Sequence, residues 1–540
     1  MSVPGQALRS RSPRAEIWLV AAITIAGLAL RLPSLHDSLF GDELSAYFVV
    51  AGRSLGGVMH LLDNHSSELN PPLFFILAWT STKLFGVSVV AMRLVSLLAG
   101  TAIIPLSFVL GRWTVGARAG LVAAALVALS PFMIYYSTEA RPYALLILLV
   151  LLSTLSLLRA LSSGGSKWWV AYAVFACAAA YTHFTSVFVL AAQFVWALVA
   201  QRDARRALVL ASSGAAIGFL PWLPALIKTT HSPGTALYQA LDPFSLHSVR
   251  IDLGRWAIGH AYLQVSQVPG DPAVALAALA VATALLGAAL ALGPRLARRE
   301  LPRPSSRLVL VILLAAGAPV GVALYSALRE SVWGARNIIS SWPGYSVMLG
   351  ALVSYPPRVW RGIATVMLVI AFGIGGVEMI PATYHRPDYG DAIAYIDRLA
   401  PRGGPIADLA APTPGPPTET EVALALAASS RFHPVFRIGL PPLKAVLAAP
   451  PYTSLPDQPG ELVAREVSAA AGHGLLFIVA PSSASIASFE AARAQHVHEG
   501  GSELALFASF LGALPSRWQP VTSRTFAGLA PVTVYVYRSR

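Results

Sequence analysis

Long apolar runs separated by short polar segments dominate the first 382 residues of the chain. A helix needs about 20 apolar residues to cross ~30 Å of hydrocarbon at ~1.5 Å per residue. Eleven runs fit this length and predict membrane-spanning helices, at 17–33, 88–110, 119–135, 142–160, 168–183, 185–200, 207–226, 272–292, 307–327, 336–353 and 361–381. The run 168–200 is too long for one crossing, so we expect a tight hairpin that turns at Tyr181-Thr182-His183-Phe184.

Lys and Arg are distributed unevenly among the loops, and cytoplasmic loops carry the excess of these residues. The basic segments contain Arg9/Arg11/Arg14, Arg112/Arg118, Arg159/Lys167, Arg202/Arg205/Arg206, Arg295/Arg298/Arg299/Arg303/Arg307 and Arg358/Arg361. Eleven crossings place all of them on the cytoplasmic side, with the N-terminus inside and the C-terminus outside. The apolar stretch 71–87 would break this pattern if it crossed, so we expect it to be a juxtamembrane helix on the outer side.

The pattern changes after residue 382, where Pro- and Gly-rich turns alternate with apolar runs of strand length. We expect helices at 388–399, 419–430, 461–473 and 485–495, and strands at 404–409, 434–439, 474–480 and 531–538. Helices that alternate with strands predict a small α/β domain. The chain should therefore have two domains, a helical membrane domain at 1–382 and an extracytoplasmic α/β domain at 383–540.

Composition supports a polytopic α-helical membrane protein, because 55% of the residues are hydrophobic and only 12% are charged, about half the usual charged share of roughly 25%. The net charge of +13 follows from basic cytoplasmic loops and does not require a nucleic-acid partner.

The single Cys177 excludes an intramolecular disulfide and makes a thiolate metal site implausible. No small-residue cleavage site follows the first run, so we expect a retained helix and no signal peptide. P-loop, dinucleotide-binding, HExxH and nucleophile-elbow motifs are absent, which argues against an ATP-driven pump.

Two adjacent carboxylates, Asp42 and Glu43, follow the first predicted helix by about eight residues. Neighbouring side chains on a helix point ~100° apart, so one can face a cavity while the other caps a helix or pairs with a cation. The alternative is that Asp42 only caps a juxtamembrane helix that begins at Glu43.

A second polar group contains His65, Glu68 and Asn70, the last of which precedes Pro71-Pro72. Asn before Pro is a natural helix start. His65 and Glu68 are suited to a metal or a sugar, but two ligands do not make a metal site. A solvated loop is the alternative.

A third group, Tyr135-Tyr136-Ser137-Thr138-Glu139-Ala140-Arg141-Pro142-Tyr143, lies between two predicted spanning helices. Polar residues near lipid are costly and often line a cavity, and the guanidinium of Arg141 suits phosphate. The alternative for Arg141 is an interfacial side chain within a tyrosine belt. His183 at the hairpin tip is a substrate contact or a buried structural residue, and Arg336 opens a further predicted helix.

In this order, the segments GDELSAYF, NPPLFFIL, YYSTEARPYALL, YTHF and RNIISSWPGYSVML resemble the successive motifs of bacterial GT-C glycosyltransferases related to the protein O-mannosyltransferases. The lipid A aminoarabinose transferases are more distantly similar. The resemblance covers residues 17–200 best and 307–382 loosely. The family usually has His or Lys before Pro-Pro-Leu, whereas this chain has Asn70.

The resemblance implies a hexosyl- or pentosyltransferase that moves a sugar from a polyprenyl-phosphate donor to a glycan, lipid or protein hydroxyl on the outer face of the bacterial plasma membrane. A phosphate ester leaves without much acid assistance, so one general base suffices for an inverting displacement. The resemblance assigns catalysis to Asp42, as the base, and Glu43. It assigns donor-phosphate or substrate binding to Tyr136, Glu139, Arg141, His183, Arg336, His65 and Asn70.

We expect no cofactor, and the sequence does not point to a divalent metal. The alternatives are a non-catalytic polyprenyl-lipid-binding envelope protein and a lipid or sugar transporter. A transporter would place ionisable residues at mid-bilayer and often shows internal repetition, and the sequence shows neither feature.

Overall fold

The computed structural model describes residues 13–63, 68–229, 244–263, 271–297, 304–408, 429, 431, 433–437, 460–480, 510–529 and 531–540. The chain divides into two compact units. The first consists of residues 1–33, 95–223 and 242–378, and the second of residues 34–94, 224–241 and 379–540.

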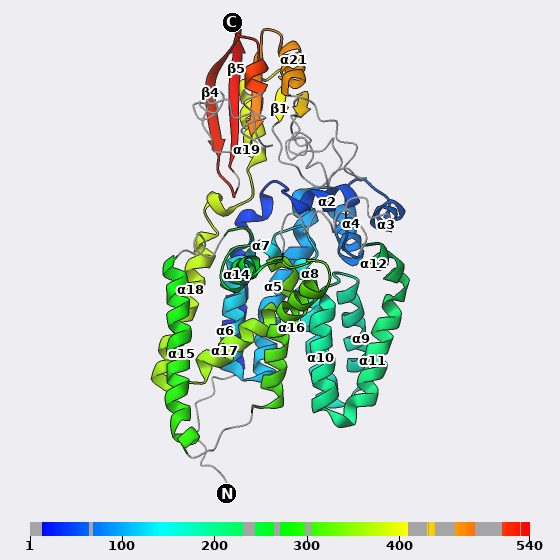
Figure 1. Ribbon diagram of the computed structural model, residues 1–540, viewed down its shortest axis with the longest axis vertical. Coiled ribbons are helices and arrows are strands. Elements are labelled where there is room, and N and C mark those ends of the chain that lie inside the picture. Colours follow the sequence, from blue (N-terminus) through cyan, green and yellow to red (C-terminus); the bar gives the residue numbers. More distant parts are fainter. Residues whose placement is uncertain are drawn as a thin grey trace. The chain divides into compact units, whose positions relative to one another are not determined.

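The first unit is helical and contains most of the long apolar helices (Figure 1). Its helices are α1 (Pro13–Ala29), most of α5 (Val89–Thr114), α6 (Ala117–Leu129), α7 (Pro131–Ser137), α8 (Tyr143–Ser163), α9 (Ser166–Ala180), α10 (Ser186–Ala200), α11 (Arg205–Phe219), α14 (Leu246–Ala257), α15 (Asp271–Ala297), α16 (Ser306–Leu328), the 3₁₀ helix η5 (Ala335–Ser341), α17 (Trp342–Ser354) and α18 (Arg358–Glu378). Each of the eleven predicted spans coincides with helix. The turn between α9 and α10 lies where the hairpin was expected.

Seven helical segments are long and apolar enough to cross a membrane, or eight if the bent pair α6–α7 forms one span, among the residues that the structure describes. The chain is therefore polytopic, while the number of eleven crossings stays a prediction. The remaining predicted spans coincide with shorter helices such as α9 and α10, of 15 residues each.

The predicted span 119–135 is not one straight helix, because α6 and α7 meet at an angle of 63°. Ser130 caps α7 by accepting a hydrogen bond from the N–H of Met133, and Pro131 occupies the first turn. The fully buried Arg31 donates to the carbonyls of Val127 and Ala128 (3.1 and 3.2 Å), which have lost their helical partners at this break. The break thus sets the direction of α7 and of the tyrosines that it carries.

The second unit combines short helices with an α/β layer structure. Its N-terminal helices are α2 (Asp42–Val50), α3 (Leu55–Asp63) and α4 (Leu73–Phe85), followed by the first residues of α5. The helix α4 corresponds to the juxtamembrane helix expected at 71–87, and begins directly after Pro72.

The C-terminal part of this unit contains α19 (Tyr389–Leu399), β1 (Ile406–Asp408), β2 (Val435–Arg437), α21 (Gly460–Ala471), β3 (Leu475–Ala480), β4 (Trp518–Phe526) and β5 (Val532–Ser539). The sheet has the order β2-β1-β3-β5-β4, in which β1 pairs in parallel with β2 and β3, and β5 runs antiparallel to both of its neighbours. Four predicted strands are confirmed with boundaries shifted by one or two residues. The strand β4 was not expected. The helix expected at 485–495 lies outside the described residues, as does the helix expected at 419–430 apart from residue 429.

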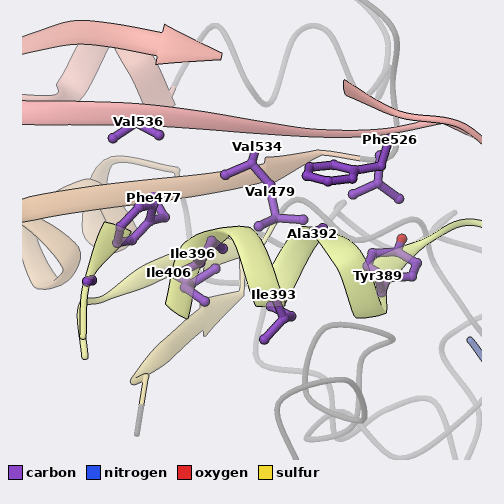
Figure 2. Close-up of a cluster of buried hydrophobic side chains, with 12 residues drawn as sticks. Tyr389, Ala392, Ile393, Ile396, Ile406, Phe477, Val479, Phe526, Val534 and Val536 are labelled. Carbon is purple, nitrogen blue, oxygen red and sulfur yellow. The ribbon is translucent and has the colours of Figure 1, made fainter. Parts of the chain in front are cut away.

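Alternate residues of the strands bury opposite faces of this sheet. Phe477, Val479, Val534 and Val536 face α19 and pack on Ala392, Ile393 and Ile396 (Figure 2). Leu476, Ile478, Tyr535 and Tyr537 face the other way and pack on α21. An α/β domain of three layers is the result.

Candidate functional site

Glu43 is fully buried, and two guanidinium groups surround its carboxylate. Arg93, at the start of α5, donates from Nε to Oε1 (2.8 Å) and from Nη2 to Oε2 (2.7 Å). Arg386 forms a second ion pair with Oε2 at 2.9 Å. Both oxygens are thus committed to cations, which favours a structural role for this carboxylate.

Arg93 also holds the loop between α1 and α2. Its guanidinium donates to the carbonyls of Asp37 (2.6 Å), Ser38 (3.0 Å) and Leu35 (3.1 Å). One buried side chain therefore binds backbone carbonyls along the end of the 3₁₀ helix Pro33–His36 and the residues that follow it.

Asp42 is the first residue of α2 and is half-buried. The residue at the N-cap is Gly41, with φ 57°, so the helix begins at Asp42 and not at Glu43. The alternative in which Asp42 caps a helix beginning at Glu43 is therefore wrong. Because Glu43 is enclosed, Asp42 is the more accessible carboxylate of the pair.

Glu68 and Asn70 organise the chain before α4. Oε1 of the buried Glu68 accepts hydrogen bonds from the N–H groups of Leu69 (3.0 Å) and Asn70 (3.1 Å), and from Nδ2 of Asn70 (2.6 Å). The amide of Asn70 is thus used within the loop. His65 lies outside the described residues, and the described residues contain no group of three His, Cys, Asp or Glu side chains suited to a metal ion.

In the first unit, aromatic rings from three segments form a continuous row. Tyr136 packs edge-to-face on Tyr135 (5.5 Å between ring centroids) and on Tyr143 (5.0 Å), and Tyr143 contacts His183 (5.6 Å). These residues come from α7, the start of α8 and the turn after α9. The row is buried, yet it lies where helices end and the backbone is irregular.

Two arginines belong to this row of rings. Arg141 is 5% exposed, and its backbone is fixed by Ser96 of α5, whose hydroxyl donates to the Arg141 carbonyl (3.1 Å). Arg336 lies in η5 and is half-buried. Tyr136 is within electrostatic range of both Glu139 and Arg336. The sequence-predicted residues Tyr136, Glu139, Arg141, His183 and Arg336 therefore gather in one cluster, which we call the arginine–tyrosine cluster.

His183 is neutral in this cluster. Burial and the charges of Arg141 and Arg336 lower the pKa of His183 to about 3. The backbone N–H of Thr185 donates to Nδ1 (3.3 Å), so the ring proton is on Nε2. Two guanidiniums and an imidazole N–H are donors suited to an anionic ligand.

Sequence reasoning missed two members of this neighbourhood, His260 and Tyr262, which follow α14. Their rings lie 5.0 and 5.3 Å from that of Tyr135, and Arg255 fixes the segment by donating to the Tyr262 carbonyl (3.2 Å). Tyr262 is 41% exposed, so its ring extends the buried row toward solvent.

The candidate residues thus form two groups. Asp42, Glu43 and Asn70 belong to the second unit, and the arginine–tyrosine cluster belongs to the first.

Comparison with known proteins identifies the class to which this fold corresponds. The family model described as dolichyl-phosphate-mannose-protein mannosyltransferase matches residues 69–227. No curated protein matches the sequence. The structure of ArnT from Cupriavidus metallidurans in the apo state is 12% identical, covers 97% of this chain and 98% of its own, and has a TM-score of 0.52. The structure of the same protein bound to undecaprenyl phosphate is also 12% identical, covers 97% of this chain and 98% of its own, and has a TM-score of 0.50.

At this identity the likeness to ArnT shows the fold and no more. The oligosaccharyltransferase of Archaeoglobus fulgidus tethered with an acceptor peptide is also 12% identical, over 87% of this chain and 69% of its own, with a TM-score of 0.49. The chain is a multi-span membrane protein with the fold of GT-C glycosyltransferases, and the resemblance found in the sequence is confirmed.

Proposed function

We propose that this chain is a glycosyltransferase that moves a sugar from a polyprenyl-phosphate donor to a hydroxyl group of a glycan, lipid or protein of the bacterial cell envelope, on the outer face of the plasma membrane. The observation that carries the proposal is the arginine–tyrosine cluster, in which Arg141, Arg336 and the N–H of a neutral His183 offer donors to an anion beside apolar helices. A phosphate attached to a long apolar tail needs both features at once.

The tyrosine row supplies surfaces of the kind on which a sugar ring packs. Tyr136 and Tyr143 are buried, and the exposed Tyr262 is the ring of this neighbourhood that a ligand can reach first. An aromatic ring with an apolar face and a polar hydroxyl suits a ligand of the same mixed character. Glu139 and His183 add hydrogen-bonding groups to the same cluster.

Asp42 is assigned the role of general base. In the proposed step Asp42 takes the proton of the acceptor hydroxyl, and the acceptor oxygen bonds to the anomeric carbon. The bond from that carbon to the phosphate oxygen breaks, and polyprenyl phosphate leaves with the electron pair. A single displacement of this kind inverts the anomeric centre and needs only one carboxylate.

Glu43 supports this role without taking the proton. Two guanidiniums pair with its carboxylate and keep α2 and the preceding loop in one arrangement. The adjacent Asp42 is half-buried, whereas Glu43 is fully buried, and we therefore assign the proton transfer to Asp42.

A transfer assay tests the proposal. Full-length protein in nanodiscs is incubated with a cell-envelope extract and undecaprenyl-phosphate mannose, glucose, galactose or arabinose, each labelled with tritium in the sugar. We expect one donor to pass its label from the lipid fraction to the envelope fraction, and Asp42→Asn to slow this transfer by at least ~10²-fold. Retention of all labels on lipid by a protein that binds undecaprenyl phosphate would favour the non-catalytic lipid-binding alternative.

A further inference from the structure

The loop that carries Asp42 is held by a segment more than 340 residues further along the chain. Oδ1 of Asp37 lies 3.2 Å from Nδ1 of His385, and its Oδ2 accepts the backbone N–H of Arg386 at 3.2 Å. Ser38 Oγ accepts the N–H of Gly390 at 3.1 Å. Side chains at the start of the loop thus fix the backbone of residues 385–390.

Arg386 reaches the other end of the same loop. Its side chain is almost fully buried, and its Nε lies 2.9 Å from Oε2 of Glu43, the residue next to Asp42. Residues 37–43 are therefore attached at both ends to residues 385–390. This attachment is additional to the hold of Arg93, which comes from α5.

The segment 385–390 is also part of the α/β layers. Tyr389 begins α19 and is buried in the core beneath the sheet (Figure 2). The connection from β4 to β5 packs on the same segment, because the N–H of Leu529 donates to the His385 carbonyl (2.8 Å) and a Cβ at Gly528 would meet Cα of Pro387 at 2.9 Å. One short segment thus contacts both the sheet and the Asp42 loop.

We propose that His385 and Arg386 are positioning residues for Asp42, through which the C-terminal α/β domain holds the base in its working geometry. The inference rests on the proposed function. Neither residue touches the reacting atoms. They act by fixing the loop on which the carboxylate sits, and a displacement of about 1 Å in a catalytic group can cost ~10²-fold in rate.

The contact between His385 and Asp37 adds a dependence on pH. Nδ1 faces the Asp37 carboxylate and Nε2 faces the Met379 carbonyl at 3.1 Å, and both of these groups only accept hydrogen bonds. The ring needs both protons to satisfy them. The hydrogen bond to Asp37 raises the pKa of His385, against the opposing effects of burial and of Arg386.

The raised pKa of His385 determines on which side of the pH range the contact with Asp37 is lost. Because the folded-state pKa lies above the ordinary value of about 6.5, the contact is complete below pH ~6.5 and is lost as the pH rises through the raised value. Asp37 and Arg386 are the charged groups that act on the ring among the described residues. We therefore expect turnover to fall on the alkaline side as the loop loosens.

A double-mutant cycle tests the positioning role in the full-length protein. His385→Gln and Arg386→Gln are each combined with Asp42→Asn, and transfer is measured with the donor found active in the assay above. We expect each single variant to lower kcat by roughly 10- to 100-fold, with the KM for donor changed by less than about twofold. Neither should lower kcat further in the Asp42→Asn background, because the base that they position is gone.

Two exposed residues provide matched controls. Arg398→Gln on α19 and His473→Gln after α21 make the same chemical changes in the same domain, and should leave kcat unchanged. The alkaline fall in turnover should persist in both controls and disappear in His385→Gln.

The outcomes separate this inference from the proposed function. Near-normal turnover in Asp42→Asn would remove the base assignment and the inference with it. If each double variant loses kcat by the product of the losses in its two single variants, Asp42 remains the base but the positioning role of His385 and Arg386 is overturned. If Arg386→Gln does not purify folded, the same cycle with His385→Gln decides, and an alkaline fall that His385→Gln retains would also overturn the inference.

Discussion

Replacing Arg141 by Lys should weaken the binding of undecaprenyl phosphate by about tenfold. Arg141 is almost fully buried in the arginine–tyrosine cluster, and its backbone is fixed by Ser96, so its guanidinium is held in place before the ligand arrives. Lysine keeps the positive charge but cannot form two parallel hydrogen bonds to a phosphate. A charge-assisted hydrogen bond contributes ~1.5–3 kcal/mol, and the loss of ~1.4 kcal/mol is a factor of ten in the dissociation constant.

Arg336→Lys should have a smaller effect, of roughly threefold, because Arg336 is half-buried and water screens its charge more strongly. Binding of undecaprenyl phosphate to the protein in detergent can be followed by microscale thermophoresis. Arg358→Lys, at the exposed start of α18, serves as the control and should bind as the wild type does. Unchanged affinity in both Arg141→Lys and Arg336→Lys would show that the phosphate binds elsewhere, with Lys83 and Lys228 as the next candidates.

Three further predictions concern stability and topology. Glu43→Gln removes the counter-ion of Arg93 and Arg386, which should cost ~3–5 kcal/mol and lower the Tm strongly; an unchanged Tm would show that the two ion pairs are not needed for the fold. Gly100→Ala places a methyl group against Ser137 and should lower the Tm by overpacking worth ~1–3 kcal/mol, whereas Gly214→Ala, with open space around it, should not. His473→Cys in a Cys177→Ser background should react with an impermeant maleimide on intact spheroplasts, and labelling only after permeabilisation would place the C-terminal domain in the cytoplasm.

The apolar runs predicted the helices well because each run is long and ends at polar residues or Gly. They did not predict the break at Ser130, where the signal is a Ser-Pro pair inside a continuous apolar run. Proline is compatible both with a kinked helix and with the first turn of a new helix. The separate helix is supported here by Arg31, about 100 residues earlier, which donates to a carbonyl at the break. The strand β4 was missed because its middle residues are polar and exposed, as suits the edge strand of a sheet.

The types of residue in the candidate site could be predicted from the sequence, but their partners could not. Arg141 and His183 stood out because polar residues at helix ends in a membrane protein are costly. The pairing of Glu43 with Arg93 and Arg386 joins residues 50 and 343 positions apart, so no local pattern reveals it. His260 and Tyr262 follow an amphipathic helix in a short segment without a recognisable motif, and only their packing on Tyr135 distinguishes them.

The central claim is that this protein transfers a sugar from a polyprenyl-phosphate donor with Asp42 as the base. The most direct test compares the wild type with Asp42→Asn in two measurements on the same preparations, undecaprenyl phosphate binding and sugar transfer. We expect equal binding and a turnover that is at least ~10²-fold lower in Asp42→Asn, since base assistance contributes ~10²–10⁴-fold. Near-normal turnover in Asp42→Asn, with binding intact, would contradict it.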